Sequence, residues 1–466
     1  MTFKQGYSFL VFVILASLDN AAAGVLPPLY AIIARDFAAD EAQLGLVTAV
    51  YIIILAASAA VLGYQGDRGQ RKGWLLGGTV VWGTAMVLSG QANSLGAFFF
   101  WQAITAVGVG GVSAIGFSVV SDIIPAHRRG FALSLWSMSQ LLGAAFGALL
   151  ASTVGATNWR WPFFILAAIG FLFALLYFFT KPPQRGQAEP ELTAVFAANK
   201  RYEHRITLAD LPHIWARRSN RWLLSQRLFL SLALGSTIWI PRWAIARVEA
   251  EGFALETATI VGNFFIILFN VGSLLAVLAG HLGDRWQQKN PFGRVNLALI
   301  GLLGSIPFFI ILFFLPLRDI AISDNDSIAQ LALTILLSVF TNPYVALAFV
   351  VAFIAVTLFS AEPPNWAALI TDVNLPEHRG TIIGLSRLFS AVGNASSVSL
   401  TGFLITYLTA QFTPPLNYAV GLALFQLLVL PAGLCYFGVR KYVVMDKTAV
   451  RTLLTQRAKA ATDPNP

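Results

Sequence analysis

The sequence predicts an all-α membrane protein in which twelve transmembrane helices form two pseudo-symmetric six-helix bundles. With 57% hydrophobic and only 11% charged residues, the chain is too apolar for a water-soluble globular protein. Apolar segments of about 20 residues recur along the chain, and each can cross the roughly 30 Å of bilayer hydrocarbon as a helix. Two motifs at helix ends in the first half return in the second half.

The expected spans follow from the apolar segments and their charged flanks. They lack the strict alternation of membrane β-barrel strands, which favours helices. The first segment, Tyr7 to Ile33, is longer than the apolar region of a signal peptide and is expected to be a retained helix. In chain order the expected spans cover residues 7–33, 44–64, 74–92, 96–121, 131–154, 161–180, 222–245, 257–282, 295–315, 345–371, 381–410 and 417–440.

A short charged motif follows a long apolar segment in each half of the chain. The first copy, residues 63–72, reads Gly-Tyr-Gln-Gly-Asp-Arg-Gly-Gln-Arg-Lys, and a shorter copy, Gly-His-Leu-Gly-Asp-Arg, occupies residues 280–285. Asp and Arg are costly at the centre of a bilayer, so each apolar segment must end there. Such a duplication is typical of transporters built from two similar bundles.

A second motif is repeated with a different spacing. Residues 121–130 and 371–380 share Asp, Pro, His, Arg and Gly in the same order; Asp, Arg and Gly repeat after 250 positions and Pro and His after 251, whereas the first motif repeats after 217. The second half therefore holds additional residues, and we place them at 316–344. This insertion contains an apolar run, 328–340, which is short for a span and is expected to form an interfacial or re-entrant helix.

These motifs divide the chain into bundles at 1–180 and 222–441, a linker at 181–221 and a tail at 442–466. The linker is expected to hold an amphipathic helix that starts near Thr207 and lies on the inner leaflet. With both termini in the cytoplasm, most of the 31 Lys and Arg residues lie on the cytoplasmic side, as the positive-inside rule requires. Topology and lipid headgroups thus account for the net charge of +9, and no nucleic-acid partner is expected.

The sequence carries no constellation of an enzyme. It has no phosphate-binding Gly-rich loop with Lys, no Cys/His metal set and no Gly-x-Ser-x-Gly motif, so we expect no cofactor and no metal. An ATP-driven pump is disfavoured on the same grounds. The single cysteine, Cys435, excludes a disulfide framework.

Six plus six helices, a cytoplasmic linker and Gly-x-x-x-Asp-Arg-x-x-Arg-Lys at residues 63–72 resemble the major facilitator superfamily. Within it the chain is similar to the Spinster-like branch, which includes lysophospholipid and sphingosine-phosphate exporters. This narrower resemblance rests on Asp19, on Gly-Val-Leu-Pro at 24–27, on residues 63–68, 108–113 and 159–162, and on 364–366 through 372 and 376–380. It implies a monomeric secondary active transporter in the cytoplasmic membrane that moves an amphiphilic, lysophospholipid-like substrate by alternating access, coupled to protons.

The chain departs from the family pattern at three positions. The family usually has Glu where Gly111 stands and Arg where Asn20 stands, and the superfamily's helix-4 Arg is Ile104 here. The resemblance implies that proton-coupled relatives use these charges, so it does not extend to the coupling mechanism or to the exact substrate.

Two intramembrane acids are the candidates for proton coupling. Asp19 lies near mid-bilayer in the first span, where an ionised carboxylate is costly and a group that takes up and releases a proton is expected. Glu362 precedes Pro363 and Pro364, which must break the tenth helix. The structural alternatives are a hydrogen bond from Asp19 to Asn20 or a neighbouring helix, and a Glu362 that simply reaches water in the outer half of the span.

Four residues are expected to contact the substrate. Arg387, about two turns into the eleventh helix, can bind an anionic headgroup, because guanidinium matches phosphate bidentately; it can equally snorkel to the surface. For Arg227 in the seventh helix we expect snorkelling, and for Trp243 a place in the interfacial aromatic belt. The remaining substrate candidates are Asn20, Asn394 and Trp239.

Charged residues of the two repeated motifs are expected to act in gating. By resemblance, Asp67 meets the N-terminal end of the eleventh helix, where the helix dipole attracts a carboxylate. Arg71 and Arg128 are expected to pair with acids, among them Asp122; the alternative is that these charges only set the topology. The full set of gating candidates is Asp67, Arg68, Arg71, Asp122, Arg128, Asp284 and Asp372.

Other functions fit the same fold. The chain could be a multidrug or organic-anion exporter, or a uniporter if Asp19 and Glu362 are both structural. A function of another class is a non-transporting receptor or sensor, which would be expected to carry a dedicated signalling domain.

Overall fold

The computed structural model describes residues 3–26, 29–39, 41–68, 70–123, 129–180, 184–197 and 204–462, and these residues are almost entirely helical. Within them, ten helices are long and apolar enough to cross a membrane. Shorter apolar helices occupy Leu10–Gly24, Met138–Ala151 and Ile328–Thr341. The predicted class, an all-helical protein with many membrane spans, is confirmed.

The chain divides into two compact units, and each is described by itself. The first comprises Met1–Arg221, Ala367–Ala391 and Tyr442–Pro466; the second comprises Trp222–Trp366 and Val392–Lys441. The division passes through four helices: α10 (Arg218–Leu234), α17 (Glu362–Asp372), α18 (Arg379–Leu408) and α20 (Val429–Thr462). The domain boundaries expected from the sequence stay a prediction.

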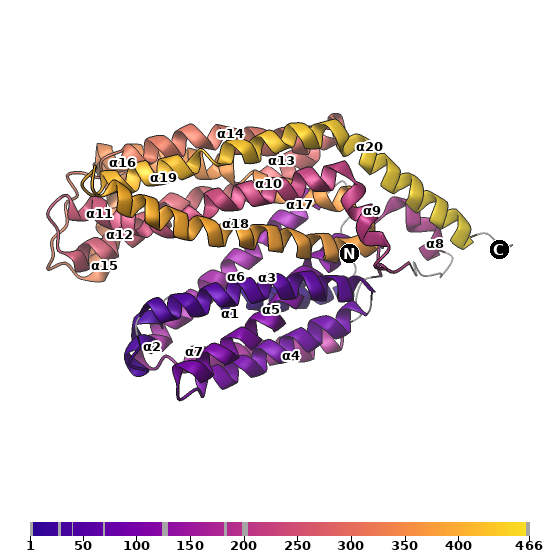
Figure 1. The fold of residues 1–466 in the computed structure, drawn as a ribbon, viewed down its shortest axis with the longest axis horizontal. Helices are drawn as coiled ribbons and strands as arrows, with labels where there is room; N and C mark the ends of the chain where they lie inside the picture. The colour runs from indigo at the N-terminus through magenta and orange to yellow at the C-terminus, as the bar shows by residue number, and fades with distance from the viewer. Residues whose placement is uncertain are drawn as a thin grey trace. The chain divides into compact units, whose positions relative to one another are not determined.

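Six long helices dominate the first unit. In this bundle α5 packs on both α3 and α4, while α1 packs on α6 and α7 (Figure 1). The helices are α1 (Phe3–Gly24), α3 (Glu41–Arg68), α4 (Arg71–Gly90), α5 (Leu95–Ile123), α6 (Arg129–Thr157) and α7 (Trp161–Phe178), with the short α2 (Tyr30–Asp36) after α1.

Small residues allow α1 and α6 to approach closely. A Cβ atom on Gly143 would lie 2.2 Å from the carbonyl oxygen of Ser17, and one on Gly147 would lie 2.1 Å from that of Ala21. The backbones of the two helices are therefore in direct contact, as expected of a small-x-x-x-small face in a membrane bundle.

The first span differs from its prediction. Instead of one helix over 7–33, α1 ends at Gly24 and α2 begins at Tyr30. The sequence explains the break, because Pro27 and Pro28 lack a backbone N–H and disfavour helical geometry in the residue before them.

Four expected spans of the second half are interrupted helices. Segments of 3₁₀ helix, η4 (Gly235–Trp239) and η5 (Asn270–Leu275), separate α10 from α11 and α12 from α13. The third interruption, at Ser360 and Ala361, separates α16 from α17, and the fourth, at Leu427 and Leu428, separates α19 from α20. The helices are α10 (Arg218–Leu234), α11 (Ile240–Glu249), α12 (Leu255–Phe269), α13 (Ala276–Lys289), α14 (Gly293–Phe314), α15 (Ile328–Thr341), α16 (Pro343–Phe359) and α19 (Leu416–Gln426).

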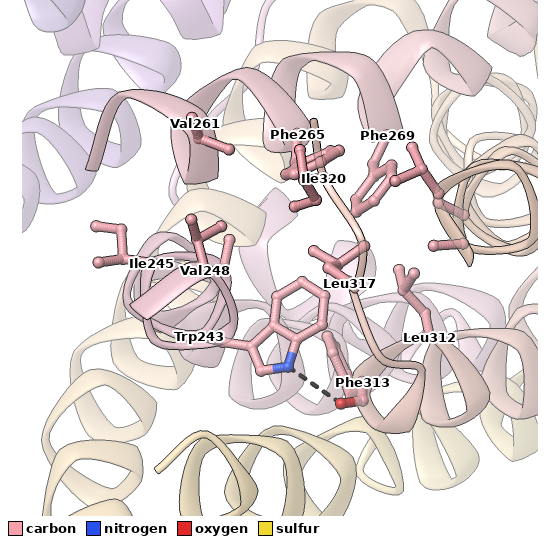
Figure 2. Close-up of a cluster of buried hydrophobic side chains, with 14 of the residues drawn as sticks. Trp243, Ile245, Val248, Val261, Phe265, Phe269, Leu312, Phe313, Leu317 and Ile320 are labelled. Atoms are coloured by element: carbon pink, nitrogen blue, oxygen red, sulfur yellow. Dashed lines mark hydrogen bonds between the residues drawn. The ribbon is translucent and has the colours of Figure 1, made fainter. Parts of the chain in front are cut away.

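A buried apolar cluster fills the second unit at one end of these helices, and Figure 2 shows Trp243 within it. Trp243 is only 1% exposed, packs edge-on against Phe313 and donates its indole N–H to the Phe313 carbonyl over 3.1 Å. The prediction that Trp243 belongs to an interfacial belt is therefore wrong. Hydropathy places an aromatic residue near a helix end, but it does not reveal which side of the helix faces a neighbour.

The predicted short apolar helix of the insertion is present as α15. Its start is fixed by a capping box, in which Ser327 and Gln330 satisfy each other's backbone N–H groups. At its end, the amide of Asn342 donates to the carbonyls of Arg318 and Asp319 over 2.7 and 2.8 Å. One face of α15 packs on α12 and α16, and the other exposes Leu333, Leu336, Leu337 and Phe340. Its interfacial position stays a prediction.

The linker contains η3 (Pro190–Leu192), α8 (Thr193–Ala197) and α9 (Asp210–Ala216). The expected amphipathic helix is shorter than its sequence pattern, because α9 begins at Asp210. The backbone N–H and hydroxyl of Thr207 donate to the carboxylate of Asp210, rather than Thr207 capping the helix. Ile214 is buried, whereas Leu208 is exposed.

Candidate transport and gating sites

Asp19 lies fully buried in α1. Its Oδ1 accepts hydrogen bonds from the backbone N–H and the side-chain amide of Asn20, both over 2.7 Å. The same Asn20 amide donates to Gln140 of α6. Among the described residues, the second carboxylate oxygen, Oδ2, has no hydrogen-bond partner. Buried polar atoms are nearly always paired, so this oxygen is a candidate position for a proton or a ligand.

Two further residues act on Asp19 from other helices of the first unit. Arg387 of α18 and Tyr51 of α3 both interact electrostatically with this carboxylate. The Tyr51 hydroxyl is also buried without a hydrogen-bond partner in the described part of the chain. The structure thus brings together Asp19, Asn20 and Arg387, and adds Tyr51 and Gln140, which the sequence reasoning missed. Polar side chains inside apolar spans were the signal that could have found them.

Glu362 is the first residue of α17 and lies fully buried in the second unit. Its Oε1 accepts hydrogen bonds from the amide of Gln226 over 3.1 Å and from the hydroxyl of Tyr436 over 2.9 Å. The other oxygen, Oε2, accepts a hydrogen bond from the guanidinium of Arg227 over 3.4 Å. The same guanidinium lies 3.9 Å from the centre of the Trp366 ring. The alternative that Glu362 reaches water is therefore wrong.

Arg227 also corrects an expectation, because it does not snorkel to the surface. Its side chain is 17% exposed and pairs with the carboxylate of Glu362. A buried acid attracts a nearby guanidinium more strongly than a remote water surface does, since an unpaired buried carboxylate is costly. Sequence spacing did not reveal this pair, because its members lie 135 positions apart.

The predicted helix break places Glu362 at a helix N-terminus. The helix α16 ends at Phe359 and α17 starts at Glu362, with Pro363 and Pro364 in its first turn. Proline is tolerated there because the first N–H groups of a helix have no intrahelical acceptor. The positive end of the helix dipole adds to the attraction for the carboxylate.

The substrate candidates fall in different units. Asn20 and Arg387 belong to the first unit, together with Asp19. Trp239 and Asn394 belong to the second, where the Trp239 indole N–H donates to the carbonyl of Val398 over 3.3 Å. Their joint role in binding one substrate stays a prediction.

The gating candidates of the first half meet the start of α18 within the first unit. Asp67 accepts hydrogen bonds from the backbone N–H of Thr381 over 2.6 Å and from its hydroxyl over 3.1 Å. The helices touch here, since a Cβ atom on Gly380 would lie 2.8 Å from Asp67 Oδ1 and 2.9 Å from the Gly63 carbonyl oxygen. The predicted contact of Asp67 with the N-terminal end of this helix is present.

Asp122 organises the second part of this site. It pairs with Arg71, as expected, and with Arg379 over 3.1 Å, and all three side chains are buried. Arg71 also donates to the carbonyl of Pro376 over 3.0 Å and lies 3.6 Å from Asp67. We refer to Asp67, Arg71, Asp122, Arg379 and Thr381 as the hairpin cluster. Its role in gating stays a prediction.

The other gating candidates lie elsewhere. Asp284 pairs with Arg294 of α14 over 2.6 Å, and both are buried in the second unit. Asp372 accepts a hydrogen bond from Lys447 of α20 over 2.8 Å. Arg68 is exposed at the end of α3, and Arg128 lies outside the described residues.

The comparisons with known proteins agree with this architecture. A family model described as Major Facilitator Superfamily matches residues 9–323. Over 450 residues the chain is 22% identical to the sphingosine-1-phosphate transporter SPNS2 of Danio rerio, covering 92% of this chain and 82% of that protein. It is 25% identical to protein spinster homolog 1 of Homo sapiens over 84% of this chain and 70% of the relative.

Another relative and two solved structures extend these findings. The Probable sulfoacetate transporter SauU of Cupriavidus necator is 28% identical over 63% of this chain and 68% of its own. A bacterial homolog of the lysosomal transporter Spinster, inward-facing and occupied, shares the fold with a TM-score of 0.52 at 18% identity, over 96% of this chain and 99% of that one. The proton:xylose symporter XylE gives a TM-score of 0.62 at 18% identity, over 93% and 95% of the two chains.

The fold and the repeated motifs therefore define a multi-pass membrane transporter. The chain belongs to the major facilitator superfamily, and its similarity to spinster proteins over most of its length confirms the Spinster-like resemblance.

Proposed function

We propose that this transporter is a proton-coupled carrier of an amphiphile with an anionic, lysophospholipid-like headgroup, and that it works by alternating access. The single observation that carries the proposal is the buried Asp19 carboxylate, which has one unpartnered oxygen and lies under the influence of Arg387. When Asp19 is ionised, its carboxylate attracts Arg387, and when Asp19 takes up a proton, this attraction is lost. Arg387 is then able to bind the substrate anion.

The Glu362 network offers a second coupling group. Protonation of Glu362 would release Arg227, which could bind an anionic group in its place, and Tyr436 and Gln226 would keep the neutral acid hydrogen-bonded. An anionic group would then replace the Glu362 carboxylate as the partner of Arg227. This replacement keeps the charges balanced, because a buried guanidinium is costly without an anion. Proton and anion would therefore bind together at this position.

Relatives support an anionic substrate. Two of them are named for sphingosine-1-phosphate and for sulfoacetate, and both compounds carry an anionic group, a phosphate or a sulfonate and carboxylate. The amphiphilic part of the proposal rests on the spinster-like relatives alone. A small organic anion without a lipid chain is the second candidate, favoured by the SauU similarity.

In this proposal both termini and the hairpin cluster lie on the cytoplasmic side of the cytoplasmic membrane, in accord with the positive-inside rule. The hairpin cluster then forms the cytoplasmic gate. It joins the α3–α4 hairpin of the first half to the start of α18 in the second half, and it must separate for the substrate to reach this side. The two states need only be nearly balanced, so contacts worth a few kcal/mol are sufficient to control them.

The test is transport in proteoliposomes with and without an imposed pH gradient. A fluorescent lysophospholipid should move in response to the gradient in the wild type, and Asp19→Asn should abolish this response while leaving the protein folded. Asp36→Asn is the matched control, because Asp36 lies exposed on α2 and pairs with Arg160. No lysophospholipid transport by the wild type, together with gradient-driven uptake of sulfoacetate, would replace the lipid substrate by a small organic anion.

A further inference from the structure

The linker between the two halves of the sequence reaches into the hairpin cluster. The backbone N–H of Gly186 donates to Asp122 Oδ1 over 3.0 Å, and Glu189 pairs with Arg379. Glu189 and Arg379 are both buried. Arg379 therefore has two carboxylate partners, one from the first-half bundle and one from the linker.

The linker turn is built to make this contact. Gly186 has a φ of +70°, which favours glycine, and a Cβ atom there would lie 2.8 Å from Leu192 Cδ1 and 3.2 Å from Pro376 Cγ. Arg185 donates to the carbonyl of Gly66 over 3.2 Å, and burial lowers its pKa. The turn at Arg185 and Gly186 therefore packs against residues that adjoin the hairpin cluster, Gly66 and Pro376.

Apolar packing ties the linker to the loop that leads into α18. Leu192 and Val195 pack with Leu375 of this loop and with the C-terminal part of α20, and these side chains are at most 6% exposed. The α20 segment is itself held to the loop, since Arg457 pairs with Glu377 and Lys447 with Asp372. Only three positions separate Glu189 from Leu192, so Glu189 must move with this assembly.

We infer that Glu189 is a positioning residue that stays with Arg379 through the transport cycle and lets the gate open. When α18 leaves the first-half bundle, Arg379 loses Asp122, but Glu189 travels with the loop and remains its partner. Without Glu189, opening would leave a guanidinium without a carboxylate, which is unfavourable away from bulk water. The Gly186–Asp122 bond is the linker contact that must break. The inference rests on the proposed alternating-access cycle.

The distinctive consequence is the direction of the effect. A residue that merely holds the gate shut would favour opening when removed, whereas Glu189→Gln should disfavour opening. We expect hydrogen exchange at the start of α18, residues 379–383, to slow by about three- to tenfold, the range given by the loss of part of one charge-assisted hydrogen bond. Transport turnover should fall by a similar factor, and Glu189→Asp should restore part of both.

Glu191→Gln is the matched control. It removes the same charge two positions away, where Glu191 faces the exposed Arg451 over 3.6 Å, and should leave both readouts unchanged. Hydrogen-exchange mass spectrometry on the purified full chain needs no substrate, so it remains decisive if the lysophospholipid is not transported. Faster exchange at 379–383 in Glu189→Gln, or exchange equal to that of the wild type, would overturn the inference. Thermal unfolding midpoints of the variants establish that each is folded.

Discussion

Asp67 offers the most direct test of the gate, because its contact with α18 involves an amide that the helix itself does not satisfy. The N–H of Thr381 lies in the first turn of α18, where backbone donors have no intrahelical acceptor. Asp67 accepts it over 2.6 Å, together with the Thr381 hydroxyl over 3.1 Å. The exchange of this amide with solvent therefore reports how often the contact opens.

The substitution Asp67→Asn keeps the shape of the side chain and one acceptor but removes its charge. A hydrogen bond to a charged group contributes about 1.5–3 kcal/mol, against about 0.5–1.5 kcal/mol for a neutral one. The attraction to the helix N-terminus, typically about 0.3–1 kcal/mol, is also lost. Relief from burying an ionised carboxylate offsets part of this, so we expect a net loss of about 1–2 kcal/mol. Exchange at Thr381 should then accelerate by about 5- to 30-fold.

Hydrogen-exchange mass spectrometry of a peptide that spans 379–383 measures this change. The control is Asp284→Asn, which alters the repeat counterpart of Asp67; its partner, Arg294, belongs to the second unit. Exchange at 379–383 should be unchanged in that variant. Equal protection in wild type and Asp67→Asn, or equal acceleration in both variants, would refute the assignment of Asp67 to the gate.

Three further predictions concern stability, measured as the thermal unfolding midpoint in detergent. Glu362→Gln should lower the midpoint, because breaking a buried ion pair costs about 3–5 kcal/mol, and adding Arg227→Gln should restore part of it. Gly147→Ala should also lower it, since its Cβ atom would lie 2.1 Å from the Ala21 carbonyl oxygen, whereas Gly73→Ala, with open space around it, should not. Trp243→Phe should cost about 1–3 kcal/mol through the lost indole hydrogen bond and volume, and an unchanged midpoint would contradict its place in the core.

The sequence predicted the helices and the ends of most spans, because hydropathy and the cost of charge in a bilayer act locally. It also predicted the contact of Asp67 with the eleventh helix, which the repeated motif and the family resemblance implied. The partners of Arg227 and the burial of Trp243 could not be predicted. Both depend on which face of a helix meets a neighbour distant in the sequence, and apolar residues all around a membrane helix hide that face.

The acidic residues of the repeated motifs have different partners in the two halves of the chain, and this difference bears on how the proposed gate works. In the first half, Asp67 and Asp122 share Arg71 and also bind Thr381 and Arg379 at the start of α18, so each loses a partner when the contact with this second-half helix breaks. In the second half, Asp284 is paired with Arg294 inside its own unit, which leaves its charge satisfied locally. In the proposed gate, the bonds of the first-half acids to α18 therefore carry the state-dependent energy.

Asp372 extends the same asymmetry to the second motif. Its repeat counterpart, Asp122, binds two arginines and the linker backbone, whereas Asp372 binds Lys447 of the α20 extension. Lys447 ties Asp372, and with it the loop at 372–379, to α20, so in the proposed gate this pair stays intact when the contacts of the first-half motif break. A gate in which one motif switches while its counterpart anchors needs only one set of contacts to be tuned. Small changes in the first-half motif can then shift the balance between the two states without destabilising the fold.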